Sequence, residues 1–377
     1  RSSGGPDATT IDAMGIGGSV VTCASGEGPG TVLDGFTITG GTGAYVGSYT
    51  FGGGMYNDRG SPKVTNCTFI GNTAESGGGM FNYYNSPTVS NCIFSGNTAN
   101  ENGGGMYSLY SSPTVSVCTF SENTARIFGG GMDNDGSNST VTKCIFRKNR
   151  AGADGGGMHN AGGSPTLTDC TFNGNTATSR GGGMSNFYSA RPIVVYCTFS
   201  GNAAATGGAM YNQLSNSLVV INCILRGDRP DEVGNDGPHS APTIDFSDVQ
   251  GGLPGGAIDG GGNIDLDPMF VRPPDPGPDG TWDGVDDDYG DLRLQAGSPC
   301  INAGDPGFVA HPGETDLEGH ARVLCGRVDM GAYEFGIGDY DCDQLVELTD
   351  FAHWSACMTG PSATADTAVP HSLDPNP

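Results

Sequence analysis

Two residues are spaced so that they could carry out acid–base chemistry together. Asp133 and His159 lie 26 residues apart at the same position of a repeated sequence element, with Asp135 and Asp154 nearby. A carboxylate that orients an imidazole, with another carboxyl group close by, is typical of general acid–base catalysis. The same position holds Tyr, Phe or Ser in other repeats, so surface variation explains the pair equally well. We therefore predict no catalytic residue.

Aromatic side chains occupy this position in several other repeats. Flat aromatic faces suit sugar rings, a partner protein or a second copy of the chain, and neighbouring stripes of them could form an exposed apolar patch. The alternative is the ordinary preference of aromatic residues for exposed strands. The predicted binding surface consists of Tyr56, Phe81, Tyr84, Tyr107 and Tyr110.

Six residues near the C-terminus have the spacing of an EF-hand-like calcium loop. Oxygen ligands at alternate positions of a twelve-residue loop, ending in a carboxylate, are the pattern that calcium requires. The predicted ligands are Asp339, Asp341, Asp343, Leu345, Glu347 and Asp350.

A second acidic segment, residues 272–291, is rich in Asp, Pro and Gly. Packed carboxylates repel one another unless a hard cation bridges them, so calcium is the predicted cofactor here as well. A solvated acidic loop without metal is the alternative. The predicted ligands are Asp279, Asp283, Asp286 and Asp288.

The Asp133–His159 pair and the aromatic residues must be positioned by a repeat that occurs seven times. A Gly-Gly-Gly-Met or Gly-Gly-Ala-Met element recurs at a step of 25 and then 26 residues, and a second element follows each copy. The segments are short, rich in Thr, Val and Phe, and separated by Gly, Pro and Asn, which specifies strands and turns. We predict an all-β fold, a right-handed parallel β-helix of about ten rungs. The repeats end at Met55, Met80, Met106, Met132, Met158, Met184 and Met210.

Alternation along each strand predicts which side chains face inward. In the first element Met80 and Asn82 face in and Phe81 faces out; in the second, Val64, Cys67 and Phe69 face in. Like residues on successive rungs then form ladders. The Asn ladder, which can bond the backbone of the turns, consists of Asn72, Asn97, Asn123, Asn149, Asn175 and Asn202.

Three regions follow from this organisation. Residues 1–271 are the predicted β-helix, with degenerate rungs at 242–249 and 261–265. Residues 272–335 are the Asp-rich loop and a C-terminal cap over the last rung, and residues 336–377 hold the calcium loop and a tail. Arg1 falls inside the β-helix, so we expect that a capping segment upstream was removed or left out.

Twelve cysteines would suggest six disulfides in a secreted protein. Seven of them occupy one inward position on successive rungs, which favours a ladder of free thiols; bridges between neighbouring rungs are the alternative. For the others we predict the pairs Cys300–Cys325 and Cys342–Cys357. The ladder consists of Cys67, Cys92, Cys118, Cys144, Cys170, Cys197 and Cys223.

The composition excludes several partners. A net charge of -25 repels nucleic-acid phosphates and anionic membranes. No stretch approaches the roughly 18 apolar residues of a membrane helix, so no membrane insertion of this segment is expected. Zincin, phosphate-loop, nucleophile-elbow and polygalacturonase motifs are also missing from the sequence.

The paired elements resemble a known repeat. Gly-Gly-Ala/Gly-Met followed by Phe-x-x-Asn, as in Phe94-Ser95-Gly96-Asn97, is similar to the GGAI and FxxN repeats of the polymorphic outer membrane protein family. More broadly, the chain resembles secreted β-helix proteins of planctomycete-type bacteria, and its calcium loop resembles one half of a type I dockerin. The resemblance implies a β-helix that is secreted or displayed on the bacterial cell surface.

The predicted function is that of a non-catalytic extracellular structural or adhesion protein, supported by calcium. Its expected partners are a second copy of the chain, another surface protein or a polysaccharide. The alternative is a polysaccharide-binding or polysaccharide-degrading protein, lyase-like or hydrolase-like, that uses the face around Asp133 and His159 or the Tyr stripes.

Overall fold

The computed structural model describes residues 1–213, 217–237, 240–282, 284, 286–336 and 344. The chain divides into one unit over Arg1–Phe335 and a second over Gly336–Pro377. No helix in the described ranges is long and apolar enough to cross a membrane. Residues of the predicted EF-hand-like loop lie outside the described residues: Asp339, Asp341, Asp343, Leu345, Glu347 and Asp350.

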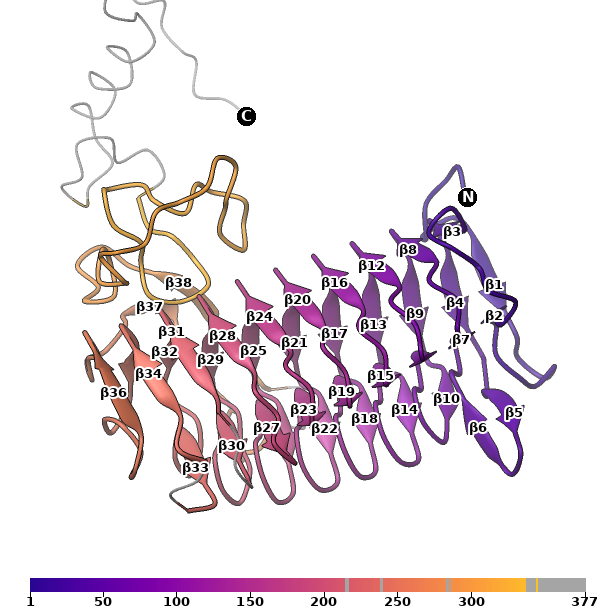
Figure 1. The fold of residues 1–377 in the computed structure, drawn as a ribbon, viewed down its shortest axis with the longest axis horizontal. Helices are drawn as coiled ribbons and strands as arrows, with labels where there is room; N and C mark the ends of the chain where they lie inside the picture. Colours follow the sequence, from indigo (N-terminus) through magenta and orange to yellow (C-terminus); the bar gives the residue numbers. More distant parts are fainter. Residues whose placement is uncertain (214–216, 238–239, 283, 285, 337–343, 345–377) are drawn as a thin grey trace, which may run out of the picture. The chain divides into compact units, whose positions relative to one another are not determined.

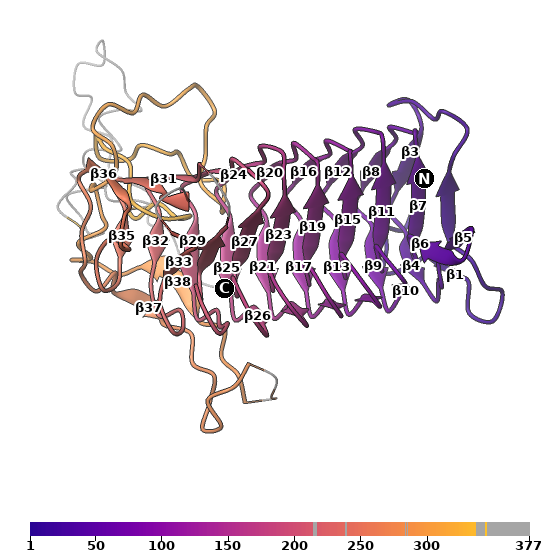
Figure 2. The ribbon, with the colours of Figure 1, turned by 60° about the horizontal axis from the view of Figure 1, so that its bottom comes forward.

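The first unit is a right-handed parallel β-helix, as predicted (Figures 1 and 2). Each turn adds one strand to each of three long parallel sheets, and about nine turns are formed in the part that the structure describes. We name the sheets after their main inward residue. The Met sheet consists of β2 (Val21–Cys23), β7 (Met55–Asp58), β11 (Met80–Tyr83), β15 (Met106–Leu109), β19 (Met132–Asp135), β23 (Met158–Ala161), β27 (Met184–Phe187), β30 (Met210–Asn212) and β33 (Val233–Asn235).

The other two long sheets are formed by the second element of each repeat, which bends between them. The Val sheet consists of β3 (Val32–Asp34), β8 (Lys63–Thr65), β12 (Thr88–Ser90), β16 (Thr114–Ser116), β20 (Thr140–Thr142), β24 (Thr166–Thr168), β28 (Ile193–Val195), β31 (Val219–Ile221), β34 (Thr243–Asp245) and β36 (Ile258–Gly261). The Phe sheet consists of β1 (Thr10–Asp12), β4 (Thr37–Thr39), β9 (Thr68–Ile70), β13 (Ile93–Ser95), β17 (Thr119–Ser121), β21 (Ile145–Arg147), β25 (Thr171–Asn173), β29 (Thr198–Ser200), β32 (Ile224–Leu225) and β35 (Asp248–Val249).

Short strands complete the turns. A small parallel sheet consists of β10 (Thr73–Ala74), β14 (Thr98–Ala99), β18 (Thr124–Ala125), β22 (Arg150–Ala151) and β26 (Thr176–Ala177). Two antiparallel hairpins are formed by β5 (Ala44–Val46) with β6 (Tyr49–Phe51), and by β37 (Phe270–Arg272) with β38 (Asp291–Leu294).

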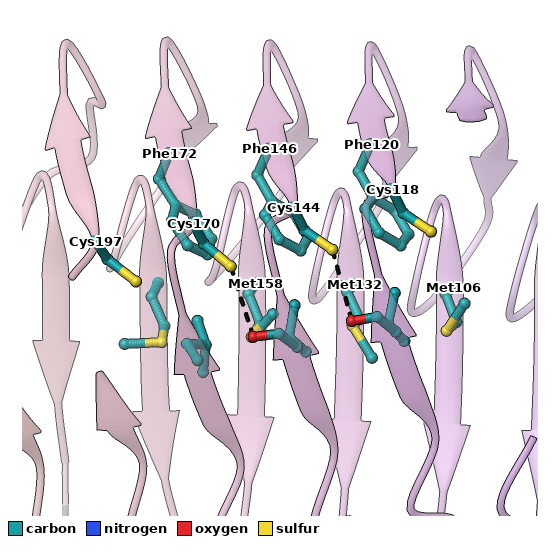
Figure 3. Packing of buried hydrophobic residues seen from close by; sticks show 14 of the residues in the cluster. Met106, Cys118, Phe120, Met132, Cys144, Phe146, Met158, Cys170, Phe172 and Cys197 are labelled. Atoms are coloured by element: carbon teal, nitrogen blue, oxygen red, sulfur yellow. Dashed lines mark hydrogen bonds between the residues drawn. The ribbon is translucent and has the colours of Figure 1, made fainter. Parts of the chain in front are cut away.

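The core is built from the predicted ladders. Phe rings on neighbouring turns, such as Phe120 and Phe146, stack with centroids 4.8 Å apart and planes only 2° from parallel. The thiols of Cys144 and Cys170 donate to the carbonyls of Val115 and Val141 on the preceding turn (Figure 3). All seven ladder cysteines are buried and free, which confirms the thiol ladder and excludes bridges between turns.

The Asn ladder binds each turn to its neighbours. Asn123 Nδ2 donates to Phe94 O on the preceding turn and to Asn149 Oδ1 on the next, both at 2.9 Å, while Asn123 Oδ1 accepts from Asn97 N and Nδ2. The ladder ends at Asp228, whose Oδ1 accepts from Asn202 N and Nδ2. A repeated amide thus satisfies backbone groups in the turn that would otherwise be buried without partners.

Glycines precede each Met for steric reasons. Gly77 has a φ of +69°, and a Cβ on Gly78 would lie 2.5 Å from Thr98 O on the next turn. Only a residue without a Cβ allows the turns to approach this closely.

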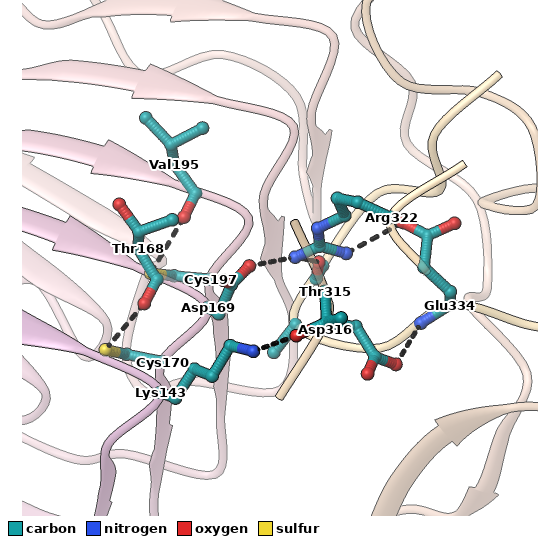
Figure 4. Close-up of polar contacts among 12 residues, drawn as sticks. Lys143, Thr168, Asp169, Cys170, Val195, Cys197, Thr315, Asp316, Arg322 and Glu334 are labelled. Atoms are coloured by element: carbon teal, nitrogen blue, oxygen red, sulfur yellow. Dashed lines mark hydrogen bonds and ion pairs between the residues drawn. The ribbon is translucent and has the colours of Figure 1, made fainter. Parts of the chain in front are cut away.

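The C-terminal part of the first unit packs against the last turns, through Phe246 and Ile264, and also along their side. We predicted only a cover over the last rung. Arg322, 1% exposed, pairs with Asp169 and Glu334 and lies over the ring of Tyr196 at 4.0 Å (Figure 4). Asp169 and Tyr196 lie on neighbouring turns of the β-helix, and Glu334 lies in the C-terminal segment. The Arg322 guanidinium therefore fixes this segment along the flank of the β-helix.

The predicted Cys300–Cys325 disulfide is wrong. Cys300 is a free, fully buried thiol in the apolar cluster beneath the C-terminal segment, and Cys325 is disulfide-bonded. Cys342 and Cys357 lie outside the described residues.

Several carboxylates of the Asp-rich loop bond to nearby groups where the structure describes it, although Asp287 Oδ1 is buried without a partner. Asp279 Oδ1 accepts from Thr281 N at 2.9 Å, and Asp288 pairs with Arg272 at 2.6 Å. No group of three or more His, Cys, Asp or Glu side chains that could hold a metal occurs among the described residues. Asp283 is outside them, so calcium binding by Asp279, Asp283, Asp286 and Asp288 stays a prediction.

Candidate functional site

The predicted aromatic surface is largely covered. Phe81 and Tyr107 face away from the core, as alternation requires, but they are only 3% and 7% exposed, and Tyr56 is half-buried. The prediction that Phe81 and Tyr107 form an exposed patch is therefore wrong. Tyr84 and Tyr110 are 54% and 52% exposed, and their rings stack at 5.2 Å.

Two flanking rows of side chains cover the face outside the Met sheet. One row is the residue before each Gly triplet, and the other is the third residue after each Met. Phe51 and Tyr83 belong to these rows, and their ring centroids lie 4.7 and 6.2 Å from that of Phe81. The residue after Met thus forms the floor of a trough and not the surface.

Asp133 and His159 meet on this floor. They are register partners on β19 and β23, and His159 Nδ1 lies 2.7 Å from Asp133 Oδ1. Both are almost fully buried, at 2% and 3% exposed, and the imidazole stacks on Phe128 with centroids 4.6 Å apart. A buried, hydrogen-bonded pair under an aromatic ring is not surface variation, so that alternative fails.

A groove of about 450 Å³ lies above this pair. Its walls come from the two flanking rows: Phe128, Asp154 and Arg180 on one side, and Asp135 and Phe187 on the other. Tyr188 extends the second wall and is 67% exposed. The groove therefore combines carboxylates, a guanidinium and aromatic faces.

Asp154 is the most unusual group in the groove. Its side chain is 7% exposed, and its Oδ1 has no hydrogen-bond partner. Burial raises the pKa of Asp154 despite the nearby positive charges of His159 and Arg180. Asn102 Oδ1, also in the groove, is buried without a partner. Two acceptors are thus placed in the groove without a donor.

The other charged groups of the groove, Asp135 and Arg180, interact with the side chains next to them. Burial, reinforced by the negative charge of Asp133, raises the pKa of Asp135. The Arg180 guanidinium lies over the rings of Phe187 and Tyr211, at 5.6 and 5.2 Å from their centroids. Stacking on two rings holds this side chain extended along the wall, with its N–H groups available to a ligand.

Sequence reasoning missed part of the site. It identified Asp133, His159, Asp135 and Asp154, which the structure brings together, but not Arg180 or the aromatic walls. The missing signal was the residue before each Gly triplet, which pairs from turn to turn as Asn102, Phe128, Asp154 and Arg180. Tracking that position as a separate ladder would have found Arg180 and Phe128, whereas Phe187 belongs to the other row.

Comparison with known proteins supports the fold. A family model described as a right-handed β-helix region matches residues 21–178. No curated protein matches the chain.

Proposed function

We propose that this chain is an extracellular β-helix protein that binds a polysaccharide in the groove above Asp133 and His159 and serves adhesion without catalysis. Sugars present hydroxyl donors, hydroxyl acceptors and apolar ring faces. The groove offers the matching groups: acceptors on Asp154 and Asn102, donors on Arg180, and the rings of Phe128 and Phe187.

The observation that carries the proposal is the carboxylate of Asp154. A buried acceptor without a donor costs about 1–3 kcal/mol, and a ligand that supplies the missing donor removes that cost. Asp154 lines a groove large enough for sugar units, and its Oδ1 is buried beside that groove without a donor.

Location outside the cell is part of the proposal. Cys325 is disulfide-bonded, and disulfides persist in oxidising compartments. The resemblance to polymorphic outer membrane protein repeats also favours the bacterial surface. Calcium binding at the C-terminal loop and self-association remain proposals from the sequence. Calcium binding is tested by measuring the melting temperature of the full chain, which should rise when calcium is added and fall again when a chelator removes it.

Binding is tested on a panel of soluble polysaccharides by titration calorimetry. We expect binding to at least one glycan, and a loss of about tenfold or more in affinity for Asp154→Ala. Asp58→Ala is the matched control, because Asp58 Oδ1 is also buried without a hydrogen-bond partner and Asp58 lies on β7, four strands from β23, the strand that follows Asp154. Equal affinity of Asp154→Ala and the unmodified protein, or no binding to any glycan, would overturn the proposal.

Cleavage is the second candidate, favoured by the same groups. The raised pKa of Asp154 suits a general acid, and the His159–Asp133 pair could serve as a base. An assay for new reducing ends on the same panel separates the two. Cleavage abolished by both Asp133→Ala and Asp154→Ala would make the protein an enzyme and overturn the non-catalytic part of the proposal.

A further inference from the structure

We propose that the groove and the exposed pair Tyr84–Tyr110 form one continuous track, which holds a neutral or amino-bearing polysaccharide chain parallel to the axis of the β-helix. This inference rests on the proposed function and specifies its ligand. It assigns a role to residues outside the groove itself.

A second ladder runs beside the groove. The fourth residue after each Met has a positive φ on successive turns and lies at the end of its Met-sheet strand. Three members carry Tyr side chains, all more than half exposed, whereas the two between them carry none. In chain order, starting from β11, they are Tyr84, Tyr110, Gly136, Gly162 and Tyr188.

The two glycines leave this row without a side chain on the turns that follow Asp133 and His159. The nearest atom of another turn, Tyr188 O, lies 3.7 Å from the position of a Cβ on Gly162, so sterics do not require glycine there. Gly136 follows Asp135, which lines the groove. The row of Tyr side chains is thus interrupted only at the turns that carry the Asp133–His159 floor.

The Tyr pair is continuous with this opening. The ring of Tyr110 lies over Gly136, where a Cβ would approach it to 2.6 Å. The Tyr110 N–H donates to Asp135 O at 2.8 Å. Tyr84 stacks on Tyr110 at 5.2 Å, with planes 25° apart. The flat aromatic surface therefore covers the two turns before Asp133, and Tyr84 lies one turn beyond the groove.

The direction of the ligand follows from the spacing of the turns. Strands of neighbouring turns are about 4.8 Å apart, so four turns from Tyr84 to Tyr188 span about 19 Å along the axis. A ligand that touches both ends must be an extended chain of several sugar units lying along the axis. A chain lying across the β-helix would reach only one or two of these side chains.

The charge of the track selects the kind of sugar. Asp133, Asp135 and Asp154 outnumber Arg180, even with a protonated His159. A groove with net negative charge repels a negatively charged ligand, because the electrostatic potential in such a groove amounts to several kT. Neutral glycans, or glycans with amino groups, are therefore expected to bind, and polyuronates are not.

The experiment compares oligosaccharides of increasing length by calorimetry. The probes are cello-oligosaccharides, chitosan oligosaccharides and oligogalacturonates, measured on the full chain. We expect affinity for one of the first two series to rise with length, and oligogalacturonates to bind most weakly.

The decisive variant is Tyr84→Asn with Tyr110→Asn. Asn is chosen because both positions have positive φ, of 47° and 49°, which Asn tolerates. Loss of two stacking faces should weaken long oligosaccharides about tenfold and leave the shortest that bind unchanged. Tyr45→Ala, an exposed Tyr on the β5–β6 hairpin, is the control.

The outcomes separate this inference from the proposed function. If the double variant binds long oligosaccharides as the unmodified protein does, the track is wrong, even where Asp154→Ala still abolishes binding. If oligogalacturonates bind most tightly, the charge argument is wrong. If Asp154→Ala has no effect at any length, the groove itself is not the site.

Discussion

Asp133 Oδ1 and His159 Nδ1 lie 2.7 Å apart across one turn of the β-helix, at positions that are paired in the strand register. The 26-residue repeat brings together two residues that would otherwise be far apart. Both are buried beneath a groove lined by Asp154 and Arg180, so the pair belongs to the floor of a site.

Removing Asp133 should destabilise the protein locally. Asp133→Ala leaves the Nδ1 of a buried imidazole without its partner, which costs about 1–3 kcal/mol. Denaturant unfolding measures the loss. Ser185→Ala, at the same position two turns after Asp133, is the control and should change stability by less than about 1 kcal/mol. A loss for Asp133→Ala no larger than that of the control would contradict the importance of the pair.

The Asn ladder should be more costly to interrupt than any surface change. Asn123→Ala removes two donated and two accepted hydrogen bonds inside the β-helix, and at least about 3 kcal/mol of unfolding free energy should be lost. Asn100→Ala, at an exposed position on the preceding turn, should stay within about 0.5 kcal/mol. Equal effects in denaturant unfolding would show that the ladder contributes no more than a surface Asn.

The carboxyl pair that closes this ladder predicts a pH dependence. Burial raises the pKa of Asp228 to about 6 and that of Glu232 to about 11. The folded state therefore holds protons that the unfolded state has released, and this pair destabilises the fold increasingly as pH rises from about 4 towards 11.

Glu232→Gln should remove most of that dependence. The variant is expected to match the unmodified protein near pH 4 and to exceed it by more than about 1 kcal/mol at pH 9. Thermal unfolding at both pH values measures this. A variant that is less stable at pH 9 would show that ionised Glu232 contributes to the fold.

The thiol ladder predicts an unreactive set of cysteines. All seven ladder thiols are buried inside the β-helix, where an alkylating reagent does not reach them. Alkylation without reductant should label none of the seven in the folded protein and all seven after unfolding. Mass spectrometry counts the labels. Ladder cysteines that require reduction before they react would reveal bridges between turns.

Arg322 should control the docking of the C-terminal segment. Arg322→Met leaves Asp169 and Glu334 buried without a counter-charge, a loss of about 3–5 kcal/mol. Limited proteolysis should then cut within residues 296–335 before the turns of the β-helix. Arg293→Met is the control, because Arg293 is exposed and pairs only with nearby Asp291. Equal protease resistance of the two variants would show that Arg322 does not hold the C-terminal segment against the β-helix.

Sequence alone was sufficient for the β-helix. A fixed period, with Met80, Cys92 and Phe94 recurring at inward positions, determines the register, because a shift by one residue would expose every ladder. The degenerate turns near β34 and β36 and the burial of the Cys ladder were also predicted correctly.

The site was predicted only in part. The alternation of side chains along a strand shows which of them point into the core and which point away from it, but not whether a side chain that points away is exposed to solvent. Phe81 points out of the sheet and is nevertheless covered by Phe51, the residue before a Gly triplet, and by Tyr83, two residues further along its own strand. Arg322 lies in a region without periodicity, so no pattern linked it to Asp169. A contact between a repeat and a non-repeating segment produces no periodic pattern in the sequence, so sequence analysis could not detect it.

The central claim, a glycan in the groove, is tested most directly by a crystal structure of the chain soaked with the oligosaccharide that binds best. The account predicts a sugar hydroxyl within hydrogen-bond distance of Asp154 Oδ1 and sugar rings along the Tyr110 side of the groove. An occupied site elsewhere on the protein, with the groove holding only water at saturating ligand, would contradict it.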